Sequence, residues 1–118
     1  MRRLILATLI AGAVCAAAGD VSGNWKVTGS IGQFAVNLVC SFHDAGGKLT
    51  GSCKGEDIGE VQLTGEEDGK TVKWSYNVNF QGMPLTVNYA GTLDSATAMK
   101  GQISVMGTES GSFAATKQ

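Results

Sequence analysis

A single histidine, His43, is the side chain in this sequence best suited to acid–base chemistry near neutral pH. A general base needs a serine or a water molecule held beside it in a pocket, and a metal ion needs several ligands close together. His43 instead lies beside Asp44 near a predicted hairpin turn, on the outward face of its strand. We therefore expect an ordinary exposed histidine, no catalytic residue and no enzymatic activity.

Carboxylates gather in two predicted turns and raise the question of calcium binding. The two groups are Glu56, Asp57 and Glu60, and Glu66, Glu67 and Asp68. Neither group has the ligand spacing of a known calcium loop, so solvated turns are the better interpretation. We expect no metal and no cofactor.

The first eighteen residues have the composition of a secretory signal peptide. A basic start with Arg2 and Arg3 is followed by an apolar run at 4–14 and by small residues up to Ala18. We place cleavage after Ala18, which leaves a mature chain of 19–118 in the periplasm or outside the cell. Lipid attachment at Cys15 is the alternative, and the bulky Val14 before it disfavours that interpretation.

Charge and hydropathy exclude two classes of partner for the mature chain. Loss of Arg2 and Arg3 moves the formal net charge from −1 to −3 and leaves no arginine, whereas a nucleic-acid surface needs clustered basic residues. No second apolar stretch is long enough to serve as a membrane anchor. One hundred residues form one domain, which we expect to be a monomer.

Period-two alternation of apolar and polar residues runs through the mature chain, interrupted at clusters of Gly, Asn and Asp. It predicts no helix and eight strands, at 24–29, 33–43, 48–55, 60–66, 70–80, 83–92, 97–105 and 111–117. Their apolar faces could be buried in a two-sheet sandwich or in a closed sheet. We favour an eight-stranded antiparallel up-and-down meander closed into a small barrel, because closure removes exposed strand edges.

The two cysteines of the mature chain are expected to form a disulfide. A two-residue turn at 46–47 places Cys40 opposite Cys53 and Phe42 opposite Gly51. The cysteine pair then falls at a position without cross-strand hydrogen bonds, where the two backbones come closest.

Three further turns fix the expected strand registers. A turn at 68–69 places Leu63 opposite Trp74, Val61 opposite Tyr76 and Glu67 opposite Lys70. A turn at 81–82 places Val78 opposite Leu85, Tyr76 opposite Val87 and Trp74 opposite Tyr89. A three-residue turn at 94–96 places Tyr89 beside Gly101 and Val87 beside Ile103. Inward glycines should give room to the aromatic rings, and these are Gly51, Gly65, Gly91, Gly101 and Gly111.

All eight aromatic residues fall on the inward face of the expected barrel. They are Trp25, Phe34, Phe42, Trp74, Tyr76, Phe80, Tyr89 and Phe113. Five of them are candidate ligand-binding residues that would offer ring surfaces and two hydroxyls to a small apolar or amphipathic molecule: Trp25, Phe42, Trp74, Tyr76 and Tyr89. The alternative is that the rings fill the barrel, and short strands, which enclose little space, favour a largely filled core.

The motif at 23–25, Gly-Asn-Trp, resembles the G-x-W that opens lipocalins and related calycin barrels. The resemblance implies that Trp25 closes one end of the barrel beneath a basic residue, a place that Lys117 could take. The chain is also similar to short exported bacterial proteins with hairpins like those at 47–51 and 68–72, for which we know no established activity.

A further resemblance is to periplasmic inhibitors of secreted metalloproteases, which are small barrels with an early G-x-W and one disulfide. Those inhibitors block the enzyme with an N-terminal tail, and here only 19–22 precede the motif. Two hypotheses follow: a non-enzymatic binder of a small apolar or amphipathic ligand, and a protein-interaction or inhibitor module with a filled core. The calycin resemblance favours the binder, although a fold by itself carries little information about function.

Overall fold

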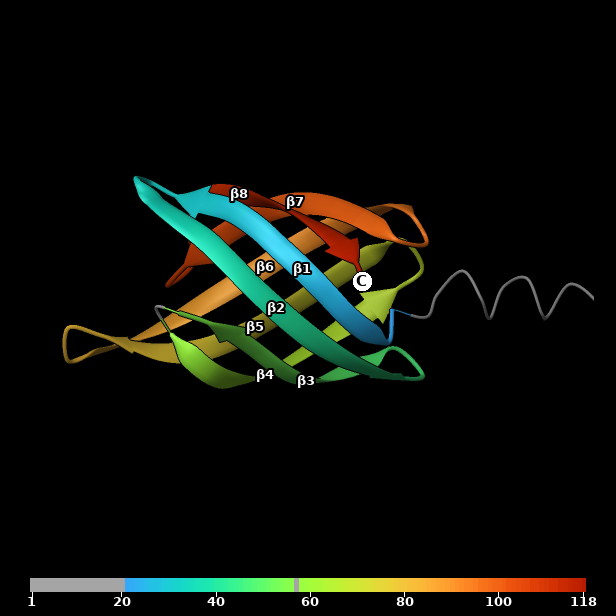
Figure 1. The fold of residues 1–118 in the computed structure, drawn as a ribbon, viewed down its shortest axis with the longest axis horizontal. Coiled ribbons are helices and arrows are strands. Elements are labelled where there is room, and N and C mark those ends of the chain that lie inside the picture. The colour runs from blue at the N-terminus through green and yellow to red at the C-terminus, as the bar shows by residue number, and fades with distance from the viewer. Residues whose placement is uncertain (1–20, 57) are drawn as a thin grey trace, which may run out of the picture.

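The computed structural model describes residues 21–56 and 58–118. The predicted leader at 1–18, with Cys15, and Asp57 of the first acidic turn lie outside the described residues. Eight strands follow one another (Figure 1): β1 (Gly23–Ile31), β2 (Phe34–Ala45), β3 (Lys48–Gly55), β4 (Gly59–Asp68), β5 (Thr71–Phe80), β6 (Met83–Ser95), β7 (Ala98–Val105) and β8 (Thr108–Lys117).

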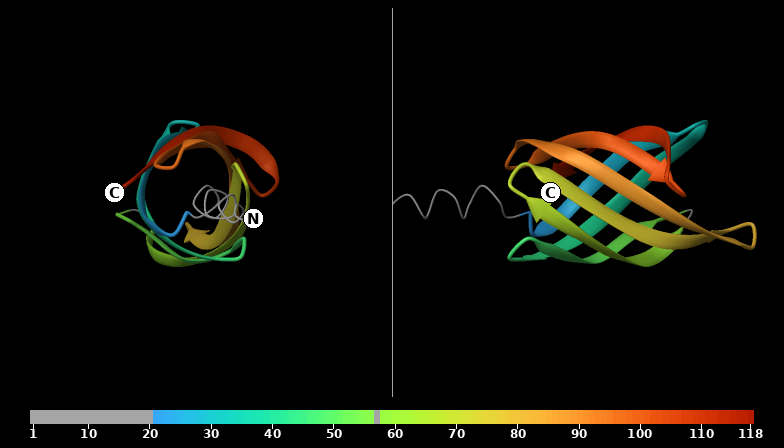
Figure 2. Two further views of the ribbon diagram at one scale, coloured as in Figure 1. Left: turned by 90° about the vertical axis from the view of Figure 1, so that its right-hand side faces the viewer. Right: turned by 180° about the vertical axis from the view of Figure 1, so that it is seen from behind.

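Each strand pairs with its neighbours in sequence, and β1 pairs with β8, so the sheet closes into an antiparallel barrel. The view along the barrel axis shows this closure as a ring of strands (Figure 2). The predicted all-β meander is therefore confirmed. In the part of the chain that the structure describes, no helix could cross a membrane.

Two predicted registers are confirmed. In β2–β3, Cys40 stands opposite Cys53 and Phe42 opposite Gly51, and the two sulfurs are bonded. In β5–β6 the pairs are Trp74 with Tyr89, Tyr76 with Val87 and Val78 with Leu85. Both hairpins have glycines with positive φ in their turns, which other residues rarely adopt, so the turns fix the registers.

The predicted register of β4–β5 is wrong by two residues. Trp74 stands opposite Gly65 rather than Leu63, and Glu67 stands opposite Val72 rather than Lys70. A Cβ at position 65 would overlap the carbonyl of Lys73 and lie 2.7 Å from the Cα of Trp74, so glycine permits the close approach. A shift of two residues keeps the same side chains inside, which is why alternation alone does not detect it.

The predicted register of β6–β7 is also wrong by two residues. Tyr89 stands opposite Ile103, and Val87 opposite Val105. An irregularity between Leu93 and Ser95 adds a residue to β6 and shortens the turn to 96–97. The sequence pattern gives no warning of this bulge.

The barrel interior holds nearly all of the large apolar side chains. The core includes Trp25, Phe42, Trp74, Tyr76, Tyr89 and Phe113, all buried. Phe34 corrects the expectation that every ring would be inside, because it lies at the end of β2 and 64% of its surface is exposed. The Phe80 side chain lies outside the described part of the structure. Gly91 confirms the expected use of inward glycine, since a Cβ there would lie 2.9 Å from Cζ of Phe113.

Candidate functional site

One end of the barrel is sealed by its own side chains. The Nε1 of Trp25 donates a hydrogen bond of 2.9 Å to the carbonyl of Val21, and both residues are buried. Lys117 stands opposite Trp25 across β1–β8, and its Cε lies 3.0 Å from where a Cβ of Gly23 would be. Leu49, Leu93 and Met99 are buried near the hairpin turns at the same end. These buried side chains pack the end of the barrel at which β1 begins, and we call it the closed end.

Above the closed end lies a layer of packed aromatic rings. Trp74 stacks on Tyr89 with centroids 4.7 Å apart and planes 5° apart, and Phe42 and Phe113 meet Trp74 edge-on at 5.0 and 5.3 Å. Stacked and edge-to-face contacts of this kind are favourable beyond their burial. Trp74 Nε1 is buried without a hydrogen-bond partner. We call this layer of four rings, Phe42, Trp74, Tyr89 and Phe113, the aromatic floor.

Two tyrosines join this floor to the space above it. The hydroxyls of Tyr76 and Tyr89 lie 2.6 Å apart and share a hydrogen bond. Burial raises the pKa of both hydroxyls above the ordinary tyrosine value, and the neighbouring Tyr76 raises the pKa of Tyr89 further. Both groups therefore stay protonated and uncharged at neutral pH.

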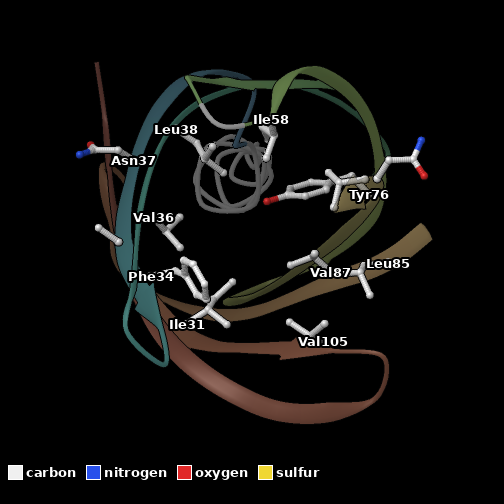
Figure 3. Close-up of a pocket in the computed structure, with 13 residues that line it drawn as sticks. Ile31, Phe34, Val36, Asn37, Leu38, Ile58, Tyr76, Leu85, Val87 and Val105 are labelled. Carbon is white, nitrogen blue, oxygen red and sulfur yellow. The ribbon is translucent and has the colours of Figure 1, made fainter. Parts of the chain in front are cut away.

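The other half of the barrel is hollow. A cavity of about 460 Å³ opens at the end where the turns β1–β2, β3–β4, β5–β6 and β7–β8 lie. Its wall is mainly aliphatic (Figure 3), and the lining residues are Ile31, Phe34, Ala35, Val36, Asn37, Leu38, Ile58, Tyr76, Val78, Asn79, Leu85, Val87 and Val105. A volume of this size falls within the range of about 300–1,000 Å³ that small-molecule sites occupy.

The structure divides the five residues predicted to bind a ligand between the cavity and the core. Tyr76 lines the cavity. Phe42, Trp74 and Tyr89 pack in the aromatic layer, and Trp25 lies at the closed end, so none of these four is among the lining residues.

Most of the cavity wall comes from aliphatic residues that the sequence interpretation passed over, including Val36, Val78, Leu85 and Val105. Their positions along the strands could have identified them as cavity residues. In a meander, alternate turns lie at the same end, so inward residues next to the odd-to-even turns must surround one mouth. The prediction instead chose the ligand-binding candidates by their aromatic rings, and most of those rings lie in the aromatic floor or at the closed end.

The mouth of the cavity is bordered by exposed apolar side chains. Phe34, Met83 and Met106 lie on three different hairpins at this end and are 64%, 63% and 62% exposed. These hairpin turns contain no charged residue between 31 and 34, 80 and 84, or 105 and 108. The β3–β4 turn at the same end differs, because it carries the exposed Glu56. The rim is therefore apolar on three hairpins and charged on the fourth.

His43 and the second acidic group, Glu66, Glu67 and Asp68, lie away from the cavity. Glu56 and Glu60 of the first group instead flank Ile58 of the cavity wall at the open end. His43 is exposed on the outer face opposite Thr50. Burial and the adjacent Asp44 carboxylate raise the pKa of Glu67 near the closed end. Within 21–56 and 58–118, no three His, Cys, Asp or Glu side chains gather as metal ligands.

These features define a small up-and-down barrel with one sealed end and one open, apolar end. No family model and no curated protein matches the chain. Two solved structures are similar in fold. The redesigned β-barrel b11L5F_LGL has a TM-score of 0.66 and 17% identity, with 83% of this chain and 91% of that chain covered. The redesigned β-barrel mFAP1, bound to DFHBI, has a TM-score of 0.60 and 14% identity, with 83% and 94% covered.

Proposed function

We propose that this chain is an exported, non-enzymatic binder of a small apolar or amphipathic molecule, acting as a monomer in the periplasm or outside the cell. The observation that carries the proposal is the open cavity of about 460 Å³, walled by aliphatic side chains and floored by packed rings. An apolar molecule entering it would lose contact with water over most of its surface, at a gain of about 25 cal/mol per Å² of apolar area buried.

Two further features support a binding role. The aromatic floor and the disulfide restrain the strands below the cavity, so that less of the site has to be ordered on binding. One structural neighbour, mFAP1, is a barrel of similar fold bound to a small molecule, DFHBI. Likeness of fold alone is a weak argument for function, so the cavity carries the proposal.

The test is a titration with N-phenyl-naphthylamine, an uncharged apolar fluorophore that brightens in apolar surroundings. The protein should bind it, and Val36→Trp, which fills the cavity from β2, should weaken binding at least about tenfold. The matched control is Val39→Trp, on the outward face of the same strand, which should bind within about twofold of the native chain. Equal binding by the Val36→Trp variant would place the fluorophore elsewhere and overturn the proposal.

The exposed rim favours a second candidate, a module that recognises another protein. Phe34, Met83 and Met106 form an apolar border on three hairpins at the open end. Exposed apolar side chains gathered in one place often mark a contact surface. Failure of the native chain to bind the fluorophore would favour this candidate over the first.

A further inference from the structure

Among the residues that the structure describes, none with a charged side chain lines the cavity, and three of the lining residues are polar: Asn37, Tyr76 and Asn79. Asn37 and Asn79 occupy outward positions of β2 and β5 and are exposed. In Figure 3 the amide of Asn37 lies outside the wall, whereas the hydroxyl of Tyr76 points into the interior. Of the lining residues that the structure describes, Tyr76 is therefore the one whose polar side-chain group points into the cavity.

The Tyr76–Tyr89 pair has one proton more than its shared hydrogen bond uses. Each hydroxyl carries one proton and can both donate and accept, and a bond between them uses one donor only. Tyr89 is 1% exposed and does not line the cavity. When Tyr89 donates to Tyr76, the proton of Tyr76 is left to point into the cavity. The first bond also polarises the second hydroxyl and makes it a better donor.

The surroundings decide which ligand group can accept that proton. An ionised group would lose its hydration in this aliphatic chamber and meet no opposite charge among the lining residues, which is costly. A neutral carbonyl, ester or ether oxygen loses less hydration and recovers one hydrogen bond from Tyr76. A molecule with no acceptor would leave the Tyr76 donor without a partner on burial, which also costs free energy.

We infer that the cavity selects an uncharged, mainly apolar molecule with one hydrogen-bond-accepting oxygen, which enters acceptor first and takes a hydrogen bond from Tyr76 at the floor. This inference rests on the proposed function and specifies its ligand. The apolar remainder of the molecule would lie along Val36, Val78 and Leu85 and reach the rim at Phe34.

Three related fluorophores test the inference. N-phenyl-naphthylamine is neutral and lacks an oxygen acceptor, anilinonaphthalene sulfonate is nearly the same molecule with an anionic group, and prodan is a neutral naphthalene ketone whose emission shifts to the red when its carbonyl accepts a hydrogen bond. The native chain should bind the sulfonate at least about tenfold more weakly than the amine, because of the cost of burying an unpaired charge. Equal or tighter binding of the sulfonate would overturn the requirement for an uncharged ligand.

The decisive variant is Tyr76→Phe, which removes the hydroxyl and keeps the ring. It should weaken prodan binding about 3- to 10-fold, the value of one neutral hydrogen bond, and shift the emission of bound prodan to the blue. Affinity for the amine should stay the same or increase, because the variant removes a donor that the amine leaves without a partner, and retained binding would show that the cavity is intact. The control, Tyr89→Phe, leaves the Tyr76 hydroxyl in the cavity and should keep the red-shifted emission of bound prodan.

The outcomes separate the two claims. If the native chain binds none of the three fluorophores, the proposed function itself fails. If the amine and prodan bind but Tyr76→Phe changes neither the affinity for prodan nor its emission, the cavity binds small molecules without the hydrogen bond. In that case the inference fails and the proposed function stands.

Discussion

The two tryptophans show how the surroundings of a side chain change what it contributes. Both indoles are buried, but Trp25 Nε1 donates to the carbonyl of Val21, whereas Trp74 Nε1 has no partner. A buried donor without a partner has lost its hydrogen bond to water, and no hydrogen bond within the protein compensates for that loss. Trp74 is held by its ring contacts with Tyr89, Phe42 and Phe113 instead.

This difference predicts an unequal response to replacement by phenylalanine. Trp25→Phe loses ring volume, loses a hydrogen bond and leaves the Val21 carbonyl unpaired, whereas Trp74→Phe loses ring volume and removes an unsatisfied donor. We expect Trp25→Phe to lower the free energy of unfolding by about 1–2 kcal/mol more than Trp74→Phe. Guanidinium denaturation of the two variants measures the difference, and a larger loss for Trp74→Phe would contradict it.

At the scale of elements, the sequence predicted the number, order and approximate bounds of the strands, and the closure of the sheet. Alternation identifies which face of a strand is inside, and turns with glycine fix the local register, as in the Cys40–Cys53 hairpin. The registers predicted for β4–β5 and β6–β7 are wrong. Both errors are shifts of two residues, which leave the inward face unchanged, and one depends on a bulge after Leu93.

The candidate site was predicted less completely for a related reason. Periodicity shows that Trp74 and Val78 both point inward, but it contains no information about how far the rings extend along the barrel axis. The stacking of Trp74 on Tyr89 fills one half of the barrel, so the cavity falls among smaller residues such as Val36 and Val87. Only the packing of the rings shows where the space remains.

The β2–β3 hairpin is covalently closed, and this predicts a measurable share of the stability of the barrel. Cys40 and Cys53 are fully buried and joined, with 13 residues of sequence separation. Cross-linking a loop of this length restricts the unfolded chain, so replacing both cysteines with serine should lower the free energy of unfolding by about 2–4 kcal/mol.

Chemical denaturation of native and doubly substituted protein measures this loss. A Cys40→Ala, Cys53→Ala variant controls for the cost of burying two serine hydroxyls, and it should lose slightly less stability than the serine variant. Labelling of the folded native protein with a thiol reagent should find neither sulfur reactive. Two reactive thiols in the native state would show that the bond is not formed.

At the scale of the whole molecule, the barrel has two halves with different packing. The closed half contains the fully buried Trp25, Leu49 and Met99, whereas the wall of the open half contains the half-buried Val36, Val78 and Leu85 around a cavity. Elements with fewer buried contacts open at lower free-energy cost than the packed core. The same sheet should therefore be less stable along one half of its length, and ligand binding should act on that half.

Amide hydrogen exchange tests this division. Hydrogen-bonded amides at the cavity ends of β5 and β6, near Val78 and Leu85, should exchange at least about tenfold faster than those near Val72 and Leu93 in the closed half of the same strands. Saturation with N-phenyl-naphthylamine should slow exchange in the open half by a factor set by the ratio of its free concentration to its Kd. Exchange in the closed half should change much less.

The Val36→Trp variant should show the slower exchange at the open end without any ligand, because the indole supplies the contacts that the cavity lacks. Equal exchange rates in the two halves would mean that the barrel opens only as a whole, and that the cavity does not weaken the sheet around it.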